Sequence, residues 1–185
     1  MAKQLLKPGT YLYPVPAAMI TCGPVEKPNI ITLAWVGTVC SDPPMVSISV
    51  RPSRHSYALI KERGEFAINL PTRDLVRSTD LCGTLSGRRV DKFVSAGLTA
   101  VPASAIATVI IAECPVNIEC RVVQILPLGS HDLFLARVVA VQADESVLGE
   151  DRQIDLLKAE PFAYGAHGYW SLDELLGTYG YSAAR

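Results

Sequence analysis

Short apolar segments dominate the first 70 residues, and prolines and glycines separate them. Residues 11–21 and 29–40 are rich in β-branched and aromatic side chains, and residues 22–28 between them are turn-forming. This pattern predicts two antiparallel strands. Residues 45–50 alternate between apolar and small polar side chains, and residues 65–70 form another apolar run, so each predicts a further strand. This part of the chain therefore predicts a β-rich fold.

Helical spacing appears in short stretches only. Tyr57 and Ile60 recur at helical spacing ahead of Gly64, which predicts a short helix that ends at the glycine. Residues 72–82 predict a second helix, and residues 88–96 predict a turn of helix. These elements are too short to make the protein mainly helical.

The C-terminal half contains the clearest hairpin. Residues 116–127 and 133–143 both contain β-branched side chains and are joined by a short turn. Long hairpins of this kind commonly close a barrel or cover its open side. Residues 105–112 predict a buried strand. The aromatic, Gly-rich residues 161–170 lead to a short predicted helix at about residues 171–176.

Length and composition restrict the class of protein. With 185 residues and no internal repeat or linker, we expect a single domain spanning residues 1–185. The chain is 49% apolar and 19% charged, which excludes a disordered protein. Its net charge of -1 gives no reason to expect a nucleic-acid or membrane partner.

The compartment is predicted from what the sequence lacks. The longest apolar run is far shorter than the roughly 20 residues of a membrane helix, and the N-terminus carries no apolar signal-peptide core. We therefore expect a soluble, cytoplasmic protein. Its five dispersed cysteines predict buried, reduced thiols rather than disulfides or a metal site.

The common catalytic and nucleotide-binding motifs are missing. No Gly-x-Gly-x-x-Gly or Gly-x-x-x-x-Gly-Lys-Ser/Thr motif occurs, and no Gly-x-Ser-x-Gly motif is present. The three histidines are far apart in the sequence. A Rossmann, P-loop, serine-hydrolase or zinc enzyme is therefore disfavoured.

One polar segment stands out where a predicted strand ends and a helix begins. It contains two arginines, three hydroxyl side chains and a histidine: Ser49, Arg51, Ser53, Arg54, His55 and Ser56. A helix N-terminus offers free N–H groups and a positive dipole end, so the segment predicts a phosphate site. Ordinary capping with solvated arginines explains the same pattern. A second basic cluster, Arg88, Arg89 and Lys92, equally fits a solvated helix face, and Trp35 fits either a ligand contact or a core position.

The order of several segments resembles the flavin reductase-like, FMN-binding split-barrel family, and most closely its flavoredoxin branch. The resemblance covers nearly the whole chain and is carried by Asn29-x-x-Thr32-x-Ala34-Trp35, Ser41-Asp42-Pro43-Pro44, Arg51-x-Ser53-x-His55-Ser56 and Gly64-Glu65-Phe66-Ala67-Ile68-Asn69-Leu70-Pro71. It implies a mainly β fold, a six-stranded antiparallel split barrel of Greek-key type. It also implies a homodimer that binds FMN non-covalently.

The resemblance also assigns cofactor-binding residues. Those implied at the flavin ring and ribityl chain are Thr32, Leu33, Ala34 and Trp35. Those implied at the phosphate are Ser49, Arg51, Ser53, His55 and Ser56. Four others are implied to approach the flavin: Asn29, Lys92, His131 and Tyr164. Many relatives have Thr in place of Ser56 and Phe in place of Tyr164, so the first position keeps its hydroxyl and the second is a mild departure.

The implied function is electron transfer from NAD(P)H or a protein donor to a flavin, metal or protein acceptor. The flavin itself carries this chemistry, so we expect neither a catalytic side chain nor a metal. Lys92 would stabilise the negative charge of the reduced flavin. His131 could equally be an exposed turn residue, and Tyr164 could simply pack on the barrel. Alternative functions are a non-catalytic FMN-binding protein, a reductase component that supplies reduced flavin to a monooxygenase, and, less favoured, a split barrel of the pyridoxamine-phosphate oxidase type.

Overall fold

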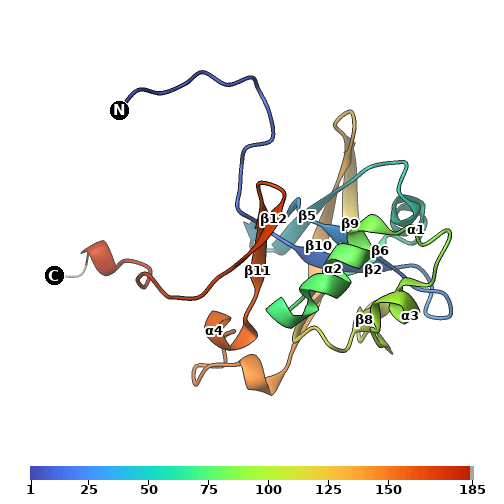
Figure 1. Cartoon of the computed structure of the whole chain (residues 1–185). Coiled ribbons are helices and arrows are strands. Elements are labelled where there is room, and N and C mark those ends of the chain that lie inside the picture. Colours follow the sequence, from blue (N-terminus) through green and yellow to red (C-terminus); the bar gives the residue numbers. More distant parts are fainter. Residues whose placement is uncertain (184–185) are drawn as a thin grey trace.

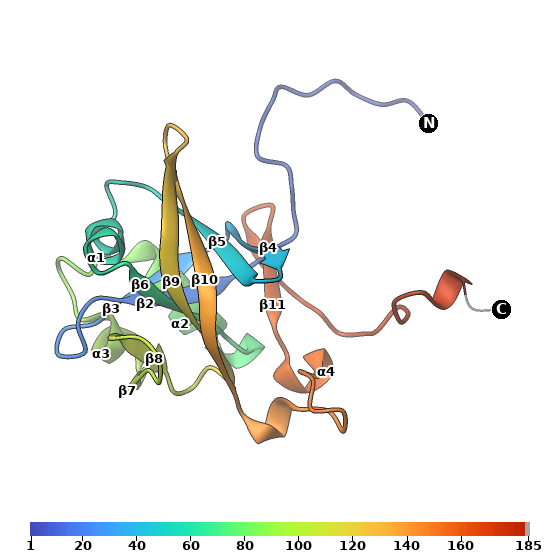
Figure 2. The same ribbon diagram turned by 180° about the vertical axis from the view of Figure 1, so that it is seen from behind.

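The computed structural model describes residues 1–183, and its main feature is a curled antiparallel sheet of seven strands (Figures 1 and 2). In chain order the strands are β2 (Ala18–Cys22), β3 (Asn29–Leu33), β4 (Val36–Ser41), β5 (Pro44–Val50), β6 (Glu65–Leu70), β9 (Val116–Pro127) and β10 (Asp132–Ala143). Their order across the sheet is β3-β2-β6-β9-β10-β5-β4. The neighbours β2–β6 and β5–β10 are not consecutive in sequence, so the sheet is no simple meander.

The sheet is a split barrel because its two edges are joined by a very short connection. β3 and β4 lie at opposite edges, yet only Ala34 and Trp35 separate them along the chain. Such a link reaches about 11 Å at most, so the sheet has to curl until its edges approach each other. The predicted mainly β split barrel is confirmed, but the strand count is seven rather than six. The predicted strand over residues 29–40 is interrupted at Ala34–Trp35, where the chain passes from one edge to the other.

The barrel core follows from alternation along the strands. Val46, Ile48 and Val50 on β5 are buried, and the residues between them are half-buried. The alternate residues pack with Phe66 on β6 and Phe134 on β10, because side chains at positions i and i+2 of a strand share a face. The core therefore fills the inside of the curled sheet.

Short helices pack beside β2 and β3, the first of them against the barrel core and the later two against the other face of these strands. They are α1 (His55–Arg63), the 3-10 turn η1 (Arg73–Leu75), α2 (Val76–Thr84) and α3 (Lys92–Ala96). Gly64 ends α1 with a φ of 67°, and Gly97 ends α3 with a φ of 64°, a left-handed backbone that glycine adopts readily. Asp91 caps α3 by accepting hydrogen bonds from two backbone N–H groups. The helix predicted over residues 88–96 thus begins only at Lys92.

Smaller elements complete the chain. β7 (Ala100–Pro102) pairs with β8 (Val109–Ile111), and β11 (Phe162–Gly165) pairs with both β1 (Val15–Pro16) and β12 (Gly168–Ser171). The remaining short helices are η2 (Glu145–Val147), α4 (Leu156–Ala159) and η3 (Tyr181–Ala183). Two predicted strands were too long: the strand over residues 105–112 is limited to β8, and the strand over residues 11–21 is divided into β1 and β2.

Glu119 on β9 is fully buried, and its carboxylate holds the segment between β7 and β8 against the sheet by hydrogen bonds. It accepts hydrogen bonds from the Ser104 N–H and hydroxyl at 2.9 and 2.7 Å, the Ala105 N–H at 2.6 Å and the Gln142 side-chain amide at 2.7 Å. Burial raises the pKa of Glu119, but these hydrogen bonds outweigh burial and hold the pKa below its ordinary value.

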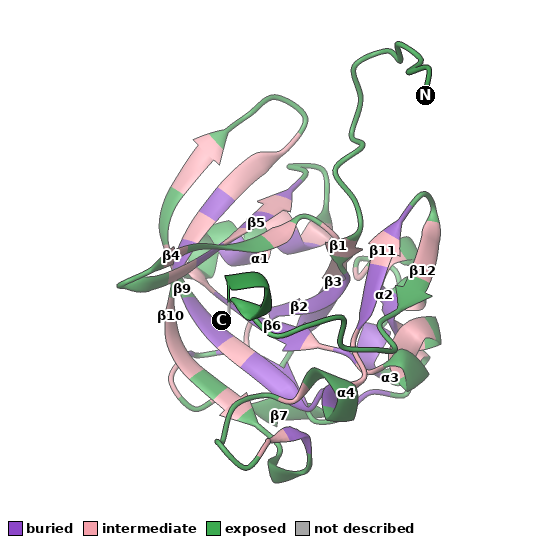
Figure 3. Cartoon of the chain, turned by 90° about the vertical axis from the view of Figure 1, so that its left-hand side faces the viewer, coloured by how far each residue is buried: buried purple, intermediate pink, exposed green. Residues whose placement is uncertain are grey.

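Both ends of the chain are extended arms that leave the barrel on the same side (Figures 1 and 2). Residues 1–14 and 172–178 contain no helix or strand, and Figure 3 shows both arms as exposed. The helix predicted at residues 171–176 is therefore wrong. Leu172, Leu175 and Leu176 have helical spacing, but they are all exposed, so no apolar surface of the described chain supports a helix there.

Candidate functional site

A cavity of about 110 Å³ lies where α1 begins, beside β3 and the segment that joins α2 to α3. Five of the residues implied for FMN line it: Asn29, Ser53, His55, Ser56 and Lys92. The other lining residues are Ile31, Arg54, Gly83, Leu85, Ser86 and Gly87. The folded chain thus brings together positions that are up to 63 residues apart in sequence. A cavity of this volume is smaller than a typical cofactor pocket, so it can accommodate only one end of a large ligand.

Three polar side chains at the cavity are almost completely buried. Asn29, Ser56 and Lys92 are 5%, 2% and 5% exposed. The side-chain amide of Asn29 donates to the Ser56 hydroxyl oxygen at 2.7 Å. The Lys92 ammonium donates to the backbone carbonyls of Ile30 and Cys82 at 2.8 and 2.7 Å. Burial of polar groups is costly unless their hydrogen bonds are made, so these contacts hold the three side chains at the cavity wall.

The N-terminus of α1 adds backbone donors to the same wall. Arg54 occupies the position before the first residue of the helix, and no side chain forms a capping hydrogen bond there. His55 and Ser56 are the first two helical residues. The first turn of a helix leaves its N–H groups without intrahelical partners and carries the positive end of the dipole. This end of α1 is therefore suited to an anion.

Positive charge dominates the electrostatics of the site. Burial lowers the pKa of Lys92, and the charge of Arg54 lowers it further, against opposing effects of Cys82 and Cys22. Burial also lowers the pKa of His55, and Arg88, Lys27 and Lys92 add to that shift. Within residues 1–183, neither ion pair of the chain involves Lys92. A buried cation without a carboxylate partner favours an anionic ligand.

Trp35 and His131 form a second group, which does not line the cavity. Their rings are 4.7 Å apart at an angle of 51°, so the tip of the β9–β10 hairpin meets the β3–β4 connection. Trp35 is 43% exposed, which makes the core interpretation of this residue wrong. Burial lowers the pKa of His131, and the charges of Arg51 and Arg54 lower it further. His131 therefore lies within the electrostatic field of the arginine segment.

The other implied residues have different surroundings. Thr32 donates its hydroxyl to the Thr79 carbonyl on α2, Leu33 packs on the barrel core, and half-buried Ala34 lies between β3 and β4. The Ser49 N–H donates to the Trp35 carbonyl at 3.0 Å, and Arg51 is exposed after β5.

Tyr164 lies on β11, and its nearest aromatic partner is Tyr169, with the ring centroids 5.5 Å apart. Tyr169 donates its hydroxyl to Asp80 on α2 at 3.0 Å. Tyr164 does not line the 110 Å³ cavity.

Residues 83–87 were not among the residues assigned to the cofactor from the sequence, yet four of them form part of the cavity wall. Gly83, Leu85 and Gly87 all line the cavity. The available signal was the pair of glycines around a short segment that precedes a basic cluster, because glycine permits close approach of the backbone. Arg88 also reaches back to the Ser53 carbonyl at 3.4 Å, which joins this segment to the start of α1.

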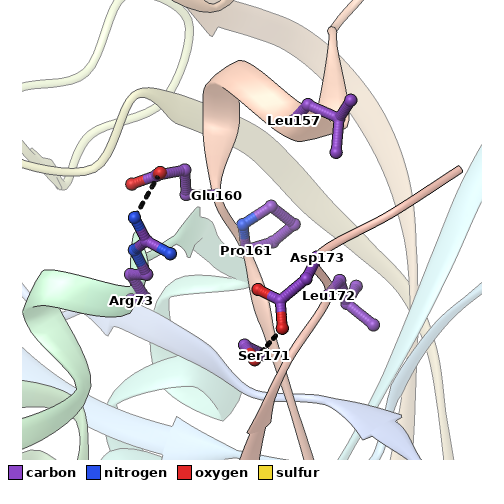
Figure 4. A pocket seen from close by; sticks show the side chains of 7 residues that line it. All are labelled: Arg73, Leu157, Glu160, Pro161, Ser171, Leu172 and Asp173. Atoms are coloured by element: carbon purple, nitrogen blue, oxygen red, sulfur yellow. Dashed lines mark hydrogen bonds and ion pairs between the residues drawn. The ribbon is translucent and has the colours of Figure 1, made fainter.

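A second cavity, of about 70 Å³, lies between η1 and the C-terminal tail (Figure 4). Its Arg73 is paired with Glu160 at 2.7 Å, and Ser171 donates to Asp173 at 2.7 Å. None of the implied cofactor residues lines it. The polar groups of this cavity are already partnered, so the 110 Å³ cavity is the better candidate for a ligand site.

Cysteines and metals do not change this assignment. The five cysteines are free thiols, and four of them are buried; Cys40 is half-buried, so burial was wrongly predicted for it. Over the described residues, no group of three or more His, Cys, Asp or Glu side chains could hold a metal ion. No helix among residues 1–183 is long and apolar enough to cross a membrane.

Comparison with known proteins decides the family. The model of the flavin reductase like domain matches residues 10–172. The chain belongs to this family. Flavoredoxin of Desulfovibrio vulgaris (Miyazaki F) is similar in structure, with a TM-score of 0.92, 32% sequence identity, and coverage of 99% of this chain and 100% of that one. Flavoredoxin from Methanosarcina acetivorans has a TM-score of 0.90, 29% identity and full coverage of both chains. The NADH-dependent FMN reductase AsuE2 of Streptomyces nodosus subsp. asukaensis is 29% identical over 73% of this chain and 72% of its own length.

The residues at the 110 Å³ cavity fit the phosphate end of a flavin mononucleotide. A phosphate is an anion with several acceptor oxygens, and the cavity presents the Ser56 hydroxyl and the open start of α1. Trp35 and His131 lie beside the arginine segment at the same end of the barrel. They offer aromatic surface for the larger, planar end of such a ligand.

Proposed function

We propose that this protein is an FMN-binding oxidoreductase of the flavoredoxin and flavin reductase type. It takes electrons from NAD(P)H or a protein donor and passes them to a flavin, metal or protein acceptor. Membership of the flavin reductase like family and the similarity to an NADH-dependent FMN reductase support the reaction class. The observation that carries the proposal is the cationic cavity with Asn29, Ser56 and Lys92 buried in its wall.

The residues of the chain bind and tune the cofactor rather than react. Ser56 and the N–H groups at the start of α1 hold the phosphate, and Arg51 and Arg54 add charge near His131. Bound FMN supplies the hydride and electron chemistry. Lys92, fixed by the carbonyls of Ile30 and Cys82, opposes the negative charge that reduction adds.

Anaerobic reduction tests the proposal directly. The protein reconstituted with FMN is mixed with NADH, with NADPH or with a low-potential donor, and loss of the flavin absorbance is followed. Reduction by at least one donor, faster than that of free FMN, is expected. Bound FMN that no donor reduces would overturn the oxidoreductase assignment and favour a non-catalytic FMN-binding protein.

Whether FMN stays bound after reduction distinguishes a flavoredoxin from a flavin reductase. A flavoredoxin keeps FMN as a prosthetic group, whereas a flavin reductase, including one that serves a monooxygenase, releases it. The full-coverage similarity to two flavoredoxins favours retention. We expect the yellow colour to stay with the protein through gel filtration, and loss of colour would identify FMN as a substrate.

The extended arms support a homodimer. They expose large apolar side chains: Leu5, Leu6, Tyr11, Leu12, Leu172, Leu175, Leu176, Tyr179 and Tyr181. Surfaces of this kind are normally covered, and a two-fold dimer lets one chain supply both the arms and the surface that they cover. The superposition on flavoredoxin covers 99% of this chain, so arm residues are included in the shared structure.

Light scattering after gel filtration tests the dimer. The full chain is expected at twice its 20.0 kDa mass. A variant with aspartate at Leu175 and Leu176 should be monomeric and still folded by circular dichroism, because both side chains are exposed in one chain. A monomeric full-length protein would contradict the dimer.

A further inference from the structure

Gly87 makes an unusually close approach to the Asn29 side chain. A Cβ atom built on Gly87 would lie 1.9 Å from Asn29 Oδ1 and 3.1 Å from the His55 ring. The Asn29 amide oxygen therefore occupies the space in which any other residue at position 87 would place its Cβ. Gly87 does not have a positive φ, so the requirement for glycine here is one of space rather than of backbone conformation.

The close approach matters because Asn29 controls the hydrogen bonding of Ser56. Its Nδ2 donates to Ser56 Oγ at 2.7 Å. A serine hydroxyl has one proton to donate and lone pairs to accept. Since the oxygen accepts from Asn29, the Ser56 proton remains free for another acceptor. Over residues 1–183, no oxygen or nitrogen atom accepts that proton. The Cys22 sulfur interacts with the Ser56 hydroxyl, but sulfur is a weak acceptor. Because Ser56 lines the cavity, a ligand oxygen there would be the stronger acceptor.

The opposite amide orientation would remove this donor. An Asn29 oxygen facing Ser56 would accept the hydroxyl proton, and the serine oxygen would then face the ligand without a proton. A displaced Asn29 would leave the Ser56 hydroxyl without a fixed direction. Either change weakens binding of an anion more than binding of a neutral ligand, because hydrogen bonds to charged groups are the stronger ones.

We propose that Gly87 is a positioning residue: by leaving space for the Asn29 amide, it directs the Ser56 proton into the cavity and gives the site its preference for a phosphate monoester over a neutral analogue. The proposal rests on the proposed FMN site and adds the residue that sets its selectivity. Gly87 itself donates no side-chain group, so its effect passes through Asn29 and Ser56.

The test compares FMN with riboflavin, which lacks the phosphate, by fluorescence titration of the full-length protein. Gly87→Ala is expected to weaken FMN binding on the order of tenfold or more and to leave riboflavin binding unchanged. Ser56→Ala should lose the same FMN preference, and the double variant should lose no more than Ser56→Ala alone. Gly37→Ala is the matched control, since a Cβ there meets nothing within 4 Å.

Each result decides the proposal. If Gly87→Ala weakens the binding of FMN and riboflavin equally, the added methyl group simply obstructs the cavity. If the losses of FMN affinity add in the double variant, Gly87 acts independently of Ser56. Either result overturns the proposal. If Gly87→Ala does not fold, Asn29→Ala takes its place. It should lose FMN affinity to the same extent, and this loss should not add to that of Ser56→Ala. A wild-type protein that binds neither ligand would overturn the FMN site itself, whereas preference for FMN in both wild type and Gly87→Ala would overturn only the role of Gly87.

Discussion

Lys92 provides the sharpest prediction about the chemistry of the bound flavin. Lys92 is 5% exposed, and its ammonium group donates to two backbone carbonyls, so the group is a fixed charge in a poorly solvated place. Lys92→Met removes the charge and keeps much of the side-chain volume. A charged hydrogen-bond interaction contributes about 1.5–3 kcal/mol. For a two-electron couple, 1.4 kcal/mol corresponds to about 30 mV, so the flavin reduction potential should fall by roughly 30–65 mV.

Anaerobic titration against a redox dye measures this shift. Lys158→Met is a matched control, because Lys158 also donates to a backbone carbonyl, that of Leu148 at 2.8 Å, but lies on α4 and does not line the 110 Å³ cavity. Its potential should equal that of the wild type. A Lys92→Met protein that binds FMN with an unaltered potential would refute the assignment of Lys92 to the reduced flavin.

Two further predictions concern ionisation elsewhere in the fold. The pKa of Glu119 lies below its ordinary value of 4.5, so its contribution to stability is present above that value and is lost as the pH falls through the lowered pKa. Glu119→Gln should therefore lower the free energy of unfolding by about 1.5–3 kcal/mol at neutral pH and flatten its acid dependence in urea titrations; an unchanged acid dependence would contradict this. Burial and the hydrogen bond to Asp80 raise the pKa of Tyr169 to about 12. The protonated phenol therefore contributes to the free energy of unfolding below its ordinary pKa of 10, and this contribution should be lost as the pH rises toward 12. An ultraviolet titration should show a phenol step near pH 12 that Tyr169→Phe removes, and removal of a step near pH 10 instead would refute the shift.

The fold was largely predictable because its strands carry local signals. The alternation over residues 45–50 and the β-branched hairpin at residues 116–143 required no distant contact to be recognised. The break at Ala34–Trp35 was not visible, because residues 29–40 have strand character throughout, and only curling of the sheet separates β3 from β4. The predicted helix at residues 171–176 failed for the opposite reason: its leucines have helical spacing but no surface of the described chain to cover.

The candidate site was predictable in part. The polar segment ahead of α1 pointed to Ser53, His55 and Ser56 from local sequence alone, and the family resemblance added Asn29 and Lys92. Which side chains are buried depends on how α2, α3 and β3 pack, and no local pattern encodes that. The contact between Gly87 and Asn29 joins residues 58 positions apart, and a lone glycine in a loop does not reveal such a contact.

The most direct test of the phosphate site is a fluorescence titration of the cofactor-free protein with FMN and, in parallel, with riboflavin. The Ser56 hydroxyl at the cavity wall and the open start of α1 predict tight binding of FMN and much weaker binding of riboflavin. Equal affinity for the two ligands would contradict the phosphate site, and binding of neither would contradict the flavin function as a whole.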